Sequence, residues 1–197
     1  MIAILKSIIA VAIIAVMYTV YSTASSVPAV SDTGTLPPVT DIEITYDYKD
    51  PDGETVKREL MCLAKNIYFE AGTESTAGKI AVGIVTMNRV EDKRWPNTVC
   101  GVVEQAEYSK WWWEAKGKKV PVRNRCQFSW FCDGKADDPY PGDIWKESVK
   151  IAEKIYFTQA YRGLLEGATH YHANYVNPGW AKHFQVVARI DSHIFYR

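Results

Sequence analysis

Residues 59–75 read ELMCLAKNIYFEAGTES, and the hydrophobic pattern of this stretch predicts the local fold. Hydrophobic residues recur in it at the three- and four-residue spacing of one helix face. They are Leu60, Leu63, Ala64, Ile67 and Ala71. Gly72 follows at once, and glycine is a common residue at helix ends. We therefore expect an amphipathic helix over residues 59–71 that packs its hydrophobic face against a core.

Within this helix, Glu70 is the candidate for chemistry. At about 100° per residue it projects close to Leu63, at the edge of the hydrophobic face and in the last turn. Hydrophobic neighbours and the negative end of the helix dipole both raise the pKa of a carboxyl group, as a general acid requires. The alternative is a solvated helix-end glutamate. Glu74 is either a second carboxylate of a glycosidase pair or a loop charge.

Two more helices are expected further along the chain. Ser75 or Thr76 is suited to cap a helix that runs to about Val90. Another begins around residues 141–143 and runs to about Tyr161. Together with the first helix, they predict a helix-dominated core.

Short aromatic-rich runs are expected to be extended. They lie at residues 126–132, 169–173 and 194–196, and residues 41–48 could form a further short strand. The predicted fold class is α+β, with helices dominant and a small hairpin or sheet element.

The N-terminus predicts export or anchoring. Lys6 precedes an uninterrupted hydrophobic run from Ile8 to Tyr18. This run lies between a signal-peptide core of roughly 7–15 residues and a membrane span of roughly 20. Residues 1–24 are therefore either a signal peptide cleaved after Ala24 or a signal anchor held in the membrane through residues 7–21. Both alternatives predict an extracytoplasmic location: periplasm, cell wall or secreted.

Composition and charge divide the rest of the chain. With 47% hydrophobic and 23% charged residues, the chain is globular and not a disordered or collagen-like protein. Residues 25–57 are predicted to be a linker, first rich in Pro and Ser and then acidic; residues 31–60 carry a net charge of −5. Residues 58–197 form the predicted catalytic domain. Residues 61–197 carry +4, so the zero net charge of the chain is a cancellation.

The four cysteines suit an exported protein, in which an even number suggests disulfides. Cys126 and Cys132 could close a short loop. Alternatively, Cys100 pairs with Cys132, and Cys62 with Cys126. A structural zinc site is the weaker alternative, because the chain has no CxxC pair.

His170 and His172 would share one face of a strand and could bind one metal ion or one substrate. His183 and His193 would have to complete a metal site. Because the chain has no HExxH motif, we favour histidines hydrogen-bonded beneath aromatic neighbours and expect no metal and no cofactor.

Three adjacent indoles, Trp111, Trp112 and Trp113, cannot all face one core. Aromatic faces stack on sugars, and Trp also lies at membrane interfaces. Lysines follow them at positions 116, 118 and 119. The role of these indoles is left open.

These motifs resemble the SleB-type (spore-cortex-lytic) cell-wall hydrolase family. Residues 63–75 resemble the opening motif of the family, in which a helix end supplies the catalytic Glu. The resemblance extends over about residues 58–197. It continues at residues 78, 81–82, 87–90, 95–103, 126–130, 132–134, 167–172, 176, 178, 180–181 and 193–196. Residues 103–125 look longer than the usual connection of the family.

The resemblance implies a lysozyme-like fold that cleaves the β-1,4 bond between N-acetylmuramic acid and N-acetylglucosamine in peptidoglycan. Glu70 matches the general acid. A lytic transglycosylase route, in which Glu70 also acts as base and an anhydro product forms, is favoured over hydrolysis by water with Glu74. By their match to family motifs, the candidates for sugar binding are Gln127, Ser129, His170, Tyr171 and His172.

The implied partner is the peptidoglycan glycan strand, which a cationic domain would attract. The membrane is a partner if the N-terminal segment is uncleaved. Export makes nucleic acid a poor partner, and we expect a monomer. A phage endolysin is one possible setting. Two other functions stay open: a metal-dependent peptidoglycan amidase or peptidase that uses the histidines, and a non-catalytic wall-binding module.

Overall fold

The structure, a computed structural model, describes residues 53–158 and 160–197. The predicted signal segment, most of the predicted linker and the possible strand at residues 41–48 lie outside these ranges. None of the helices within them has both the length and the hydrophobicity needed to cross a bilayer.

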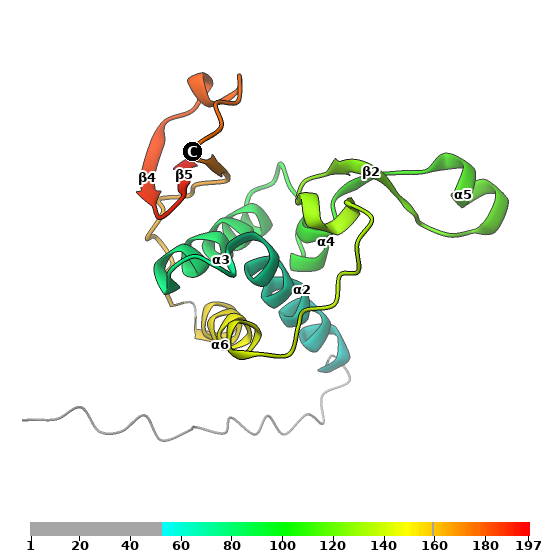
Figure 1. Cartoon of the computed structure of the whole chain (residues 1–197), viewed down its shortest axis with the longest axis horizontal. Helices are drawn as coiled ribbons and strands as arrows, with labels where there is room; N and C mark the ends of the chain where they lie inside the picture. Colours follow the sequence, from blue (N-terminus) through cyan, green and yellow to red (C-terminus); the bar gives the residue numbers. More distant parts are fainter. Residues whose placement is uncertain (1–52, 159) are drawn as a thin grey trace, which may run out of the picture. The chain divides into compact units, whose positions relative to one another are not determined.

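Three helices form the centre of the domain: α2 (Gly53–Ala71), α3 (Thr76–Glu91) and α6 (Asp143–Thr158). Figure 1 shows them packed together, and their hydrophobic faces supply most of the core. Leu63 and Ile67 of α2 are fully buried, as the helical spacing predicted.

A glycine brings α3 close to α6. A Cβ atom on Gly83 would lie 2.6 Å from the Cδ1 atom of Ile155 and 3.1 Å from that of Ile67, so a larger residue would force these buried side chains to shift. The core therefore depends on close helix packing as well as on hydrophobic spacing.

All three predicted helices are present, with shifted ends. α2 begins at Gly53, so residues 53–57, which the sequence assigned to the linker, are helical. Ser75 caps α3, and its side chain accepts a hydrogen bond from the Gly78 N–H group. α6 ends at Thr158 and not at Tyr161.

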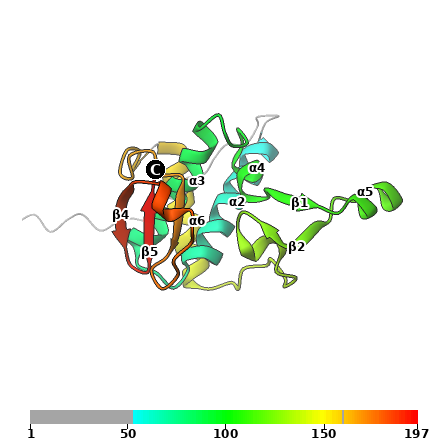
Figure 2. The ribbon, with the colours of Figure 1, turned by 90° about the horizontal axis from the view of Figure 1, so that it is seen from above.

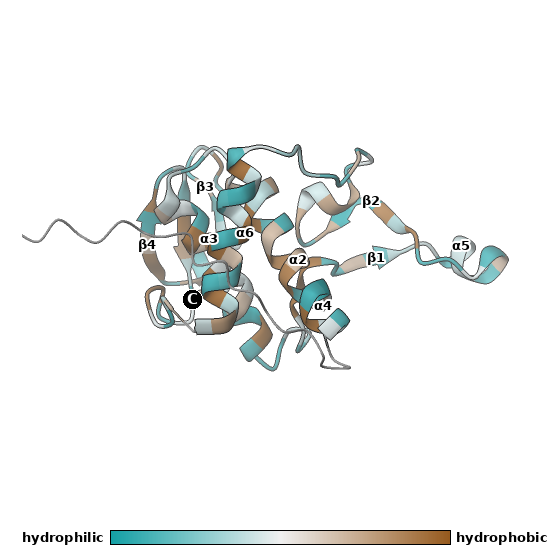
Figure 3. Cartoon of the chain, turned by 90° about the horizontal axis from the view of Figure 1, so that it is seen from below, coloured by the Kyte–Doolittle hydropathy of each residue, from teal (hydrophilic) through white to brown (hydrophobic). Residues whose placement is uncertain are grey.

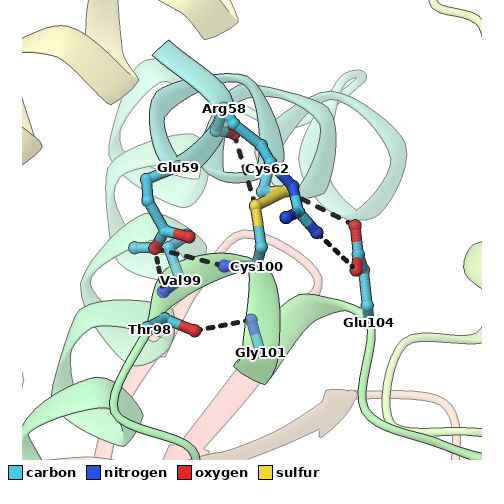
Figure 4. Close-up of a disulfide and its surroundings, with 8 residues drawn as sticks. All are labelled: Arg58, Glu59, Cys62, Thr98, Val99, Cys100, Gly101 and Glu104. Carbon is cyan, nitrogen blue, oxygen red and sulfur yellow. Dashed lines mark hydrogen bonds and ion pairs between the residues drawn. A yellow bond between two sulfur atoms is a disulfide. The ribbon is translucent and has the colours of Figure 1, made fainter. Parts of the chain in front are cut away.

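A short helix that the hydrophobic pattern did not predict, α4 (Val99–Val103), is fastened to the start of α2 (Figure 4). The carboxylate of Glu59 accepts hydrogen bonds from the backbone N–H groups of Val99 and Cys100. A disulfide joins Cys62 to Cys100. A carboxylate at a helix N-terminus satisfies unpaired N–H groups and the helix dipole, so α4 is stabilised although it is short.

Residues 106–126 form a protruding element that we call the arm. β1 (Ala106–Tyr108) pairs antiparallel with β2 (Pro121–Cys126), and α5 (Lys110–Lys116) lies between them. Figure 2 shows the arm extending away from α2, α3 and α6.

The second disulfide joins Cys126 to Cys132, so one of the alternative pairings is confirmed. The prediction of an extended segment at residues 126–132 is wrong. The strand ends at Cys126, and η1 (Ser129–Cys132) is a 3₁₀ helix. Six extended residues span about 20 Å, whereas the two Cα atoms of this disulfide are 6.2 Å apart.

A three-stranded antiparallel sheet covers the other side of the helices. Its order is β3 (His170–Ala173), β5 (His193–Tyr196), β4 (Val186–Ile190). β3 and β5 confirm the strands expected at residues 169–173 and 194–196, and all of β5 is buried. This mixed architecture, dominated by helices, agrees with the predicted α+β class. The lysozyme-like relation stays a prediction.

Candidate active site

Glu70 and Tyr171 meet between the helices and the sheet. The Tyr171 hydroxyl donates a hydrogen bond to Oε2 of Glu70 at 3.0 Å. Glu70 lies in the last turn of α2, and Tyr171 lies in the middle of β3, opposite Phe195 of β5. This hydrogen bond therefore joins the helical part of the domain, through α2, to the three-stranded sheet, through β3.

Burial raises the pKa of Glu70, which is the direction that the sequence predicted. The hydrogen bond from Tyr171 and the positive charge of Arg89 partly oppose this rise in pKa. Burial and the nearby carboxyl group raise the pKa of Tyr171 well above its usual value, so its hydroxyl stays protonated and remains a donor. Glu70 thus keeps its proton to a higher pH than an exposed glutamate does, and its ionised form also has partners.

Arg89 completes this group, and the sequence reasoning missed its role. It is buried on α3, and its Nε donates to the Thr169 carbonyl at 2.7 Å. Its guanidinium lies 4.2 Å from the ring centroid of Trp95 and 5.1 Å from that of Phe128. The signal was present, because an arginine four residues after Val85 falls on the buried face of the helix. We call Glu70, Tyr171 and Arg89 the Glu70 cluster.

Beside α2, Asn66 anchors the segment that follows the arm. It is fully buried; its Nδ2 donates to Oγ1 of Thr86, and its Oδ1 accepts from Nε1 of Trp130, both at 3.0 Å. Trp130 also stacks on Phe69, next to Glu70 in sequence, with ring centroids 4.7 Å apart. The motif around Trp130 is therefore held against the end of α2 that carries Glu70.

Gln127 and Ser129 lie in this segment, on either side of buried Phe128. Both side chains are exposed, and the hydrogen bond to Glu70 comes from Tyr171 and not from them. The structure therefore leaves their side chains available to a ligand beside the Glu70 cluster.

His170 and His172 share one face of β3, as expected, but this face is opposite to that of Tyr171. Oγ1 of Thr169 lies 3.0 Å from Nδ1 of His170. His172 is hydrogen-bonded to the Ala173 carbonyl and to the Tyr196 hydroxyl. Both histidines have partners within the protein and lie on the side of the strand away from Glu70.

Aromatic rings surround these two histidines. Trp180 has its ring centroid 5.5 Å from those of both His170 and His172. The rings of Phe184 and Tyr196 complete the layer. Burial lowers the pKa of His170, so its ring is neutral near pH 7. This arrangement matches the interpretation of hydrogen-bonded histidines beneath aromatic neighbours.

The four histidines do not converge on one point. His193 is buried beside Tyr171, on the opposite face of the sheet, whereas His183 is exposed at the end of η2 (Ala181–His183). Within residues 53–158 and 160–197, the possible metal ligands that come together are Cys62, Cys100 and Glu104. The two cysteines are joined in a disulfide, so they are not available as thiolates.

Glu74 is engaged elsewhere. Its Oε1 accepts from the Ser192 hydroxyl at 2.5 Å, and its Oε2 from the Ser192 N–H group at 3.2 Å. In return, Oδ2 of Asp191 accepts from the hydroxyl and the N–H group of Ser75. We call these four residues the clamp, because they fasten the α2–α3 loop to the β4–β5 turn.

A shallow hollow of about 420 Å³ lies at the end of α3. Its lining residues are Asn88, Glu91, Asp92, Lys93, Gly167 and Thr169. Asn88 also donates to the Ala168 carbonyl at 2.9 Å. Glu70 does not line the hollow, so the hollow and the Glu70 cluster are separate features.

Two solved structures resemble this chain. One is the catalytic domain of the SleB protein from Bacillus cereus, with 20% identity over 72% of this chain and 91% of that chain, and a TM-score of 0.46. The other is the catalytic domain of the germination-specific lytic transglycosylase SleB from Bacillus anthracis, with 22% identity over 72% and 95% of the chains, and a TM-score of 0.45. No curated protein matched the sequence.

A family model described as cell wall hydrolase matches residues 73–196, more than half of the chain. The match begins just after Glu70. The assignment of Glu70 as a candidate acid therefore rests on its position in α2 and on the residues around it. The matched range includes the clamp, the arm and all of the three-stranded sheet. The chain therefore belongs to the cell wall hydrolase family and is an enzyme that acts on the cell wall, which agrees with the resemblance of its motifs to the SleB-type hydrolases.

Proposed function

We propose that this enzyme cleaves the β-1,4 bond between N-acetylmuramic acid and N-acetylglucosamine as a lytic transglycosylase, with Glu70 as its general acid and base. The observation that carries this proposal is the partly buried Glu70 carboxyl group, whose pKa is raised and which has a neutral tyrosine as its hydrogen-bond partner. Family membership supports peptidoglycan as the substrate.

In the first step, Glu70 donates its proton to the glycosidic oxygen. The bond to the anomeric carbon breaks, and positive charge builds on the sugar ring. The resulting Glu70 carboxylate keeps the hydrogen bond from Tyr171 and the nearby charge of Arg89. These two groups lower the free-energy cost of forming a charge in a partly buried site.

In the second step, the Glu70 carboxylate accepts the proton of the muramic 6-hydroxyl while that oxygen attacks the anomeric carbon. The product is a 1,6-anhydro sugar, no water is consumed, and Glu70 is protonated again. One carboxyl group is sufficient for this sequence of steps.

The surroundings of Glu70 favour this route over hydrolysis. Hydrolysing glycosidases place two carboxyl groups roughly 5–9.5 Å apart. In this protein the only carboxylate near Glu70 in sequence is Glu74, four residues further on. Both oxygens of Glu74 are already bound by Ser192.

The predicted sugar-binding residues fall into two groups. Gln127 and Ser129 are exposed near the Glu70 cluster and are proposed to contact the glycan directly. Tyr171 is proposed to tune the pKa of Glu70. His170 and His172 lie on the other face of β3, so we propose that they hold this strand in place and do not touch the bond that is cleaved.

We further propose that the enzyme works outside the cytoplasm, as the hydrophobic run in residues 7–21 predicts. Sequencing the N-terminus of the mature protein tests this proposal. A mature chain that begins at Ser25 supports a cleaved signal peptide, whereas an intact N-terminus in the membrane fraction supports an anchor. An intact chain found only in the cytosol contradicts both alternatives.

The test of the reaction is digestion of purified peptidoglycan by the full chain, followed by mass spectrometry of the fragments. Fragments one water lighter than ordinary reducing ends are expected. Ordinary reducing ends would show hydrolysis and contradict the transglycosylase route. Released stem peptides, with activity lost in chelator and kept in Glu70→Gln, would show an amidase or peptidase. Binding of the chain to purified peptidoglycan without release of any fragment would indicate a non-catalytic wall-binding module.

A further inference from the structure

The arm presents an aromatic cluster that the domain does not cover. Trp111, Trp112 and Trp113 are 61%, 38% and 56% exposed, respectively. Every residue from 110 to 119 is exposed, so α5 packs no side chain into the core. An exposed hydrophobic patch of this kind typically marks an interaction surface.

α5 is nevertheless a well-formed helix. The Ser109 hydroxyl accepts a hydrogen bond from the Trp112 N–H group at its start. Gly117, with a φ of 61°, closes its end in the left-handed conformation that favours glycine. Figure 3 shows α5 at the end of the arm, apart from the helices of the domain. The arm therefore holds the three indoles out in solvent in a defined position.

Positive charge gathers around these indoles. The arm holds six basic and two acidic residues, a net charge of +4, which is the whole net charge of residues 61–197. Its two glutamates are paired with Lys110 and Arg125. In the part of the chain that the structure describes, Lys116 and Lys118 form no ion pair, and Lys119 lies over the ring of Tyr108. The partner of the arm should therefore be anionic.

The arrangement of the indoles suits a lipid interface better than a sugar chain. Consecutive residues of a helix point about 100° apart, so the three rings fan around α5. The rings of Trp111 and Trp112 meet edge to face at 83°. A sugar-stacking platform needs flat exposed ring faces, whereas a bilayer interface accepts indoles in many orientations.

We propose that the arm contacts an anionic lipid bilayer, with the indoles of α5 inserted at the headgroup level and the lysines beside the lipid phosphates. Tryptophan side chains are enriched at this depth, and each lysine near an anionic surface adds to the attraction. The inference rests on the arm alone and does not depend on the reaction at Glu70. It would hold the domain against the membrane, beside the cell wall.

The experiment adds the full chain to vesicles that contain equal parts of brominated phosphatidylcholine and phosphatidylglycerol, and it measures quenching of the Trp emission. Bromine quenches only indoles within the bilayer, so a membrane segment without Trp contributes no signal of its own. All seven Trp residues lie outside residues 1–24. We expect strong quenching for the wild type and loss of most of it in the variant Trp111→Ala, Trp112→Ala, Trp113→Ala.

A charge variant and its control complete the design. Replacing Lys116, Lys118 and Lys119 with Gln should reduce binding of the arm on the order of 100-fold, at about fivefold per lysine. The same replacement of the exposed α6 lysines 146, 150 and 154 should change quenching little. Because α5 buries no residue in the core, every variant should keep the thermal midpoint of the wild type. That measurement shows that each variant is folded.

Two results would overturn the proposal. One is equal quenching in the wild type and the Trp variant, which would place other indoles in the bilayer. The other is no quenching of the wild type in these vesicles. If the wild type then also binds purified peptidoglycan and the Trp variant does not, the arm is a contact for the wall polymer.

Discussion

The Tyr171 hydroxyl donates a hydrogen bond to the Glu70 carboxylate across 101 residues of sequence. This contact joins the last turn of α2 to the middle of β3. It is made by a phenol that stays protonated and a carboxyl group whose pKa burial raises. The acid–base properties of Glu70 therefore depend on the packing of the sheet against the helices.

Replacing Glu70 with Gln should lower the rate of peptidoglycan cleavage by about 100- to 10,000-fold, because a general acid contributes that much. The rate is measured as release of soluble fragments. Tyr175→Phe, at an exposed site, is the control and should keep the wild-type rate. A folded Glu70→Gln protein with full activity would exclude Glu70 as the acid.

The variant Tyr171→Phe should move the alkaline limb of the pH–rate profile to higher pH. The hydrogen bond from Tyr171 lowers the pKa of Glu70, so its loss lets burial raise that pKa further. Because the acid must be protonated, activity then persists to higher pH. A shift of the limb to lower pH would contradict this role of Tyr171.

The raised pKa of Glu70 should also make the free energy of unfolding depend on pH. Its pKa is higher in the folded than in the unfolded protein, so the folded state binds the proton more tightly. As pH rises above the unfolded pKa of about 4.3, the folded protein loses stability, and the loss levels off above the folded pKa. Chemical unfolding across pH should therefore show the wild type falling relative to Glu70→Gln. A wild type that gains relative stability as pH rises would refute the burial of this carboxyl group.

The clamp distinguishes a structural Glu74 from a catalytic one. Glu74→Gln and Ser192→Ala should each lower the free energy of unfolding by about 1–3 kcal/mol, because each leaves a partner unsatisfied. At a temperature where both variants are folded, their cleavage rates should stay within about tenfold of the wild type. A 100-fold loss of rate in Glu74→Gln, without a similar loss in Ser192→Ala, would instead make Glu74 a second catalytic carboxylate.

The two disulfides should differ in their effect on stability. Cys62 and Cys100 are 38 residues apart, whereas Cys126 and Cys132 are 6 apart. In the chain-entropy account, removal of the longer link costs about 4 kcal/mol of unfolding free energy and removal of the shorter about 2 kcal/mol. Paired Cys→Ala variants measured by chemical unfolding check this order. The reverse order would mean that strain or contacts outweigh loop entropy.

The sequence alone determined the features that depend on local periodicity. The three helices and the strands at residues 169–173 and 194–196 were predictable because a buried helix face repeats every three to four residues and a short β run alternates. The same reasoning placed the Glu70 carboxyl group at the edge of a buried face and a helix start at Ser75 or Thr76, of which Ser75 is the cap. It failed at residues 126–132, where a disulfide prevents the extended form.

Only the tertiary structure decided what surrounds the carboxyl group. Tyr171 of β3 donates a hydrogen bond to Glu70, and Arg89 of α3 adds a positive charge near it. Ser192, distant in sequence, donates hydrogen bonds to both carboxylate oxygens of Glu74. Packing likewise decided which face of β3 turns toward Glu70, the face that carries Tyr171. Contacts between distant segments depend on how the elements pack, and local spacing carries no record of that packing. The sequence therefore singled out Glu70 as the candidate acid, while the fold supplied the hydrogen-bond donor and the neighbouring charge of its carboxyl group.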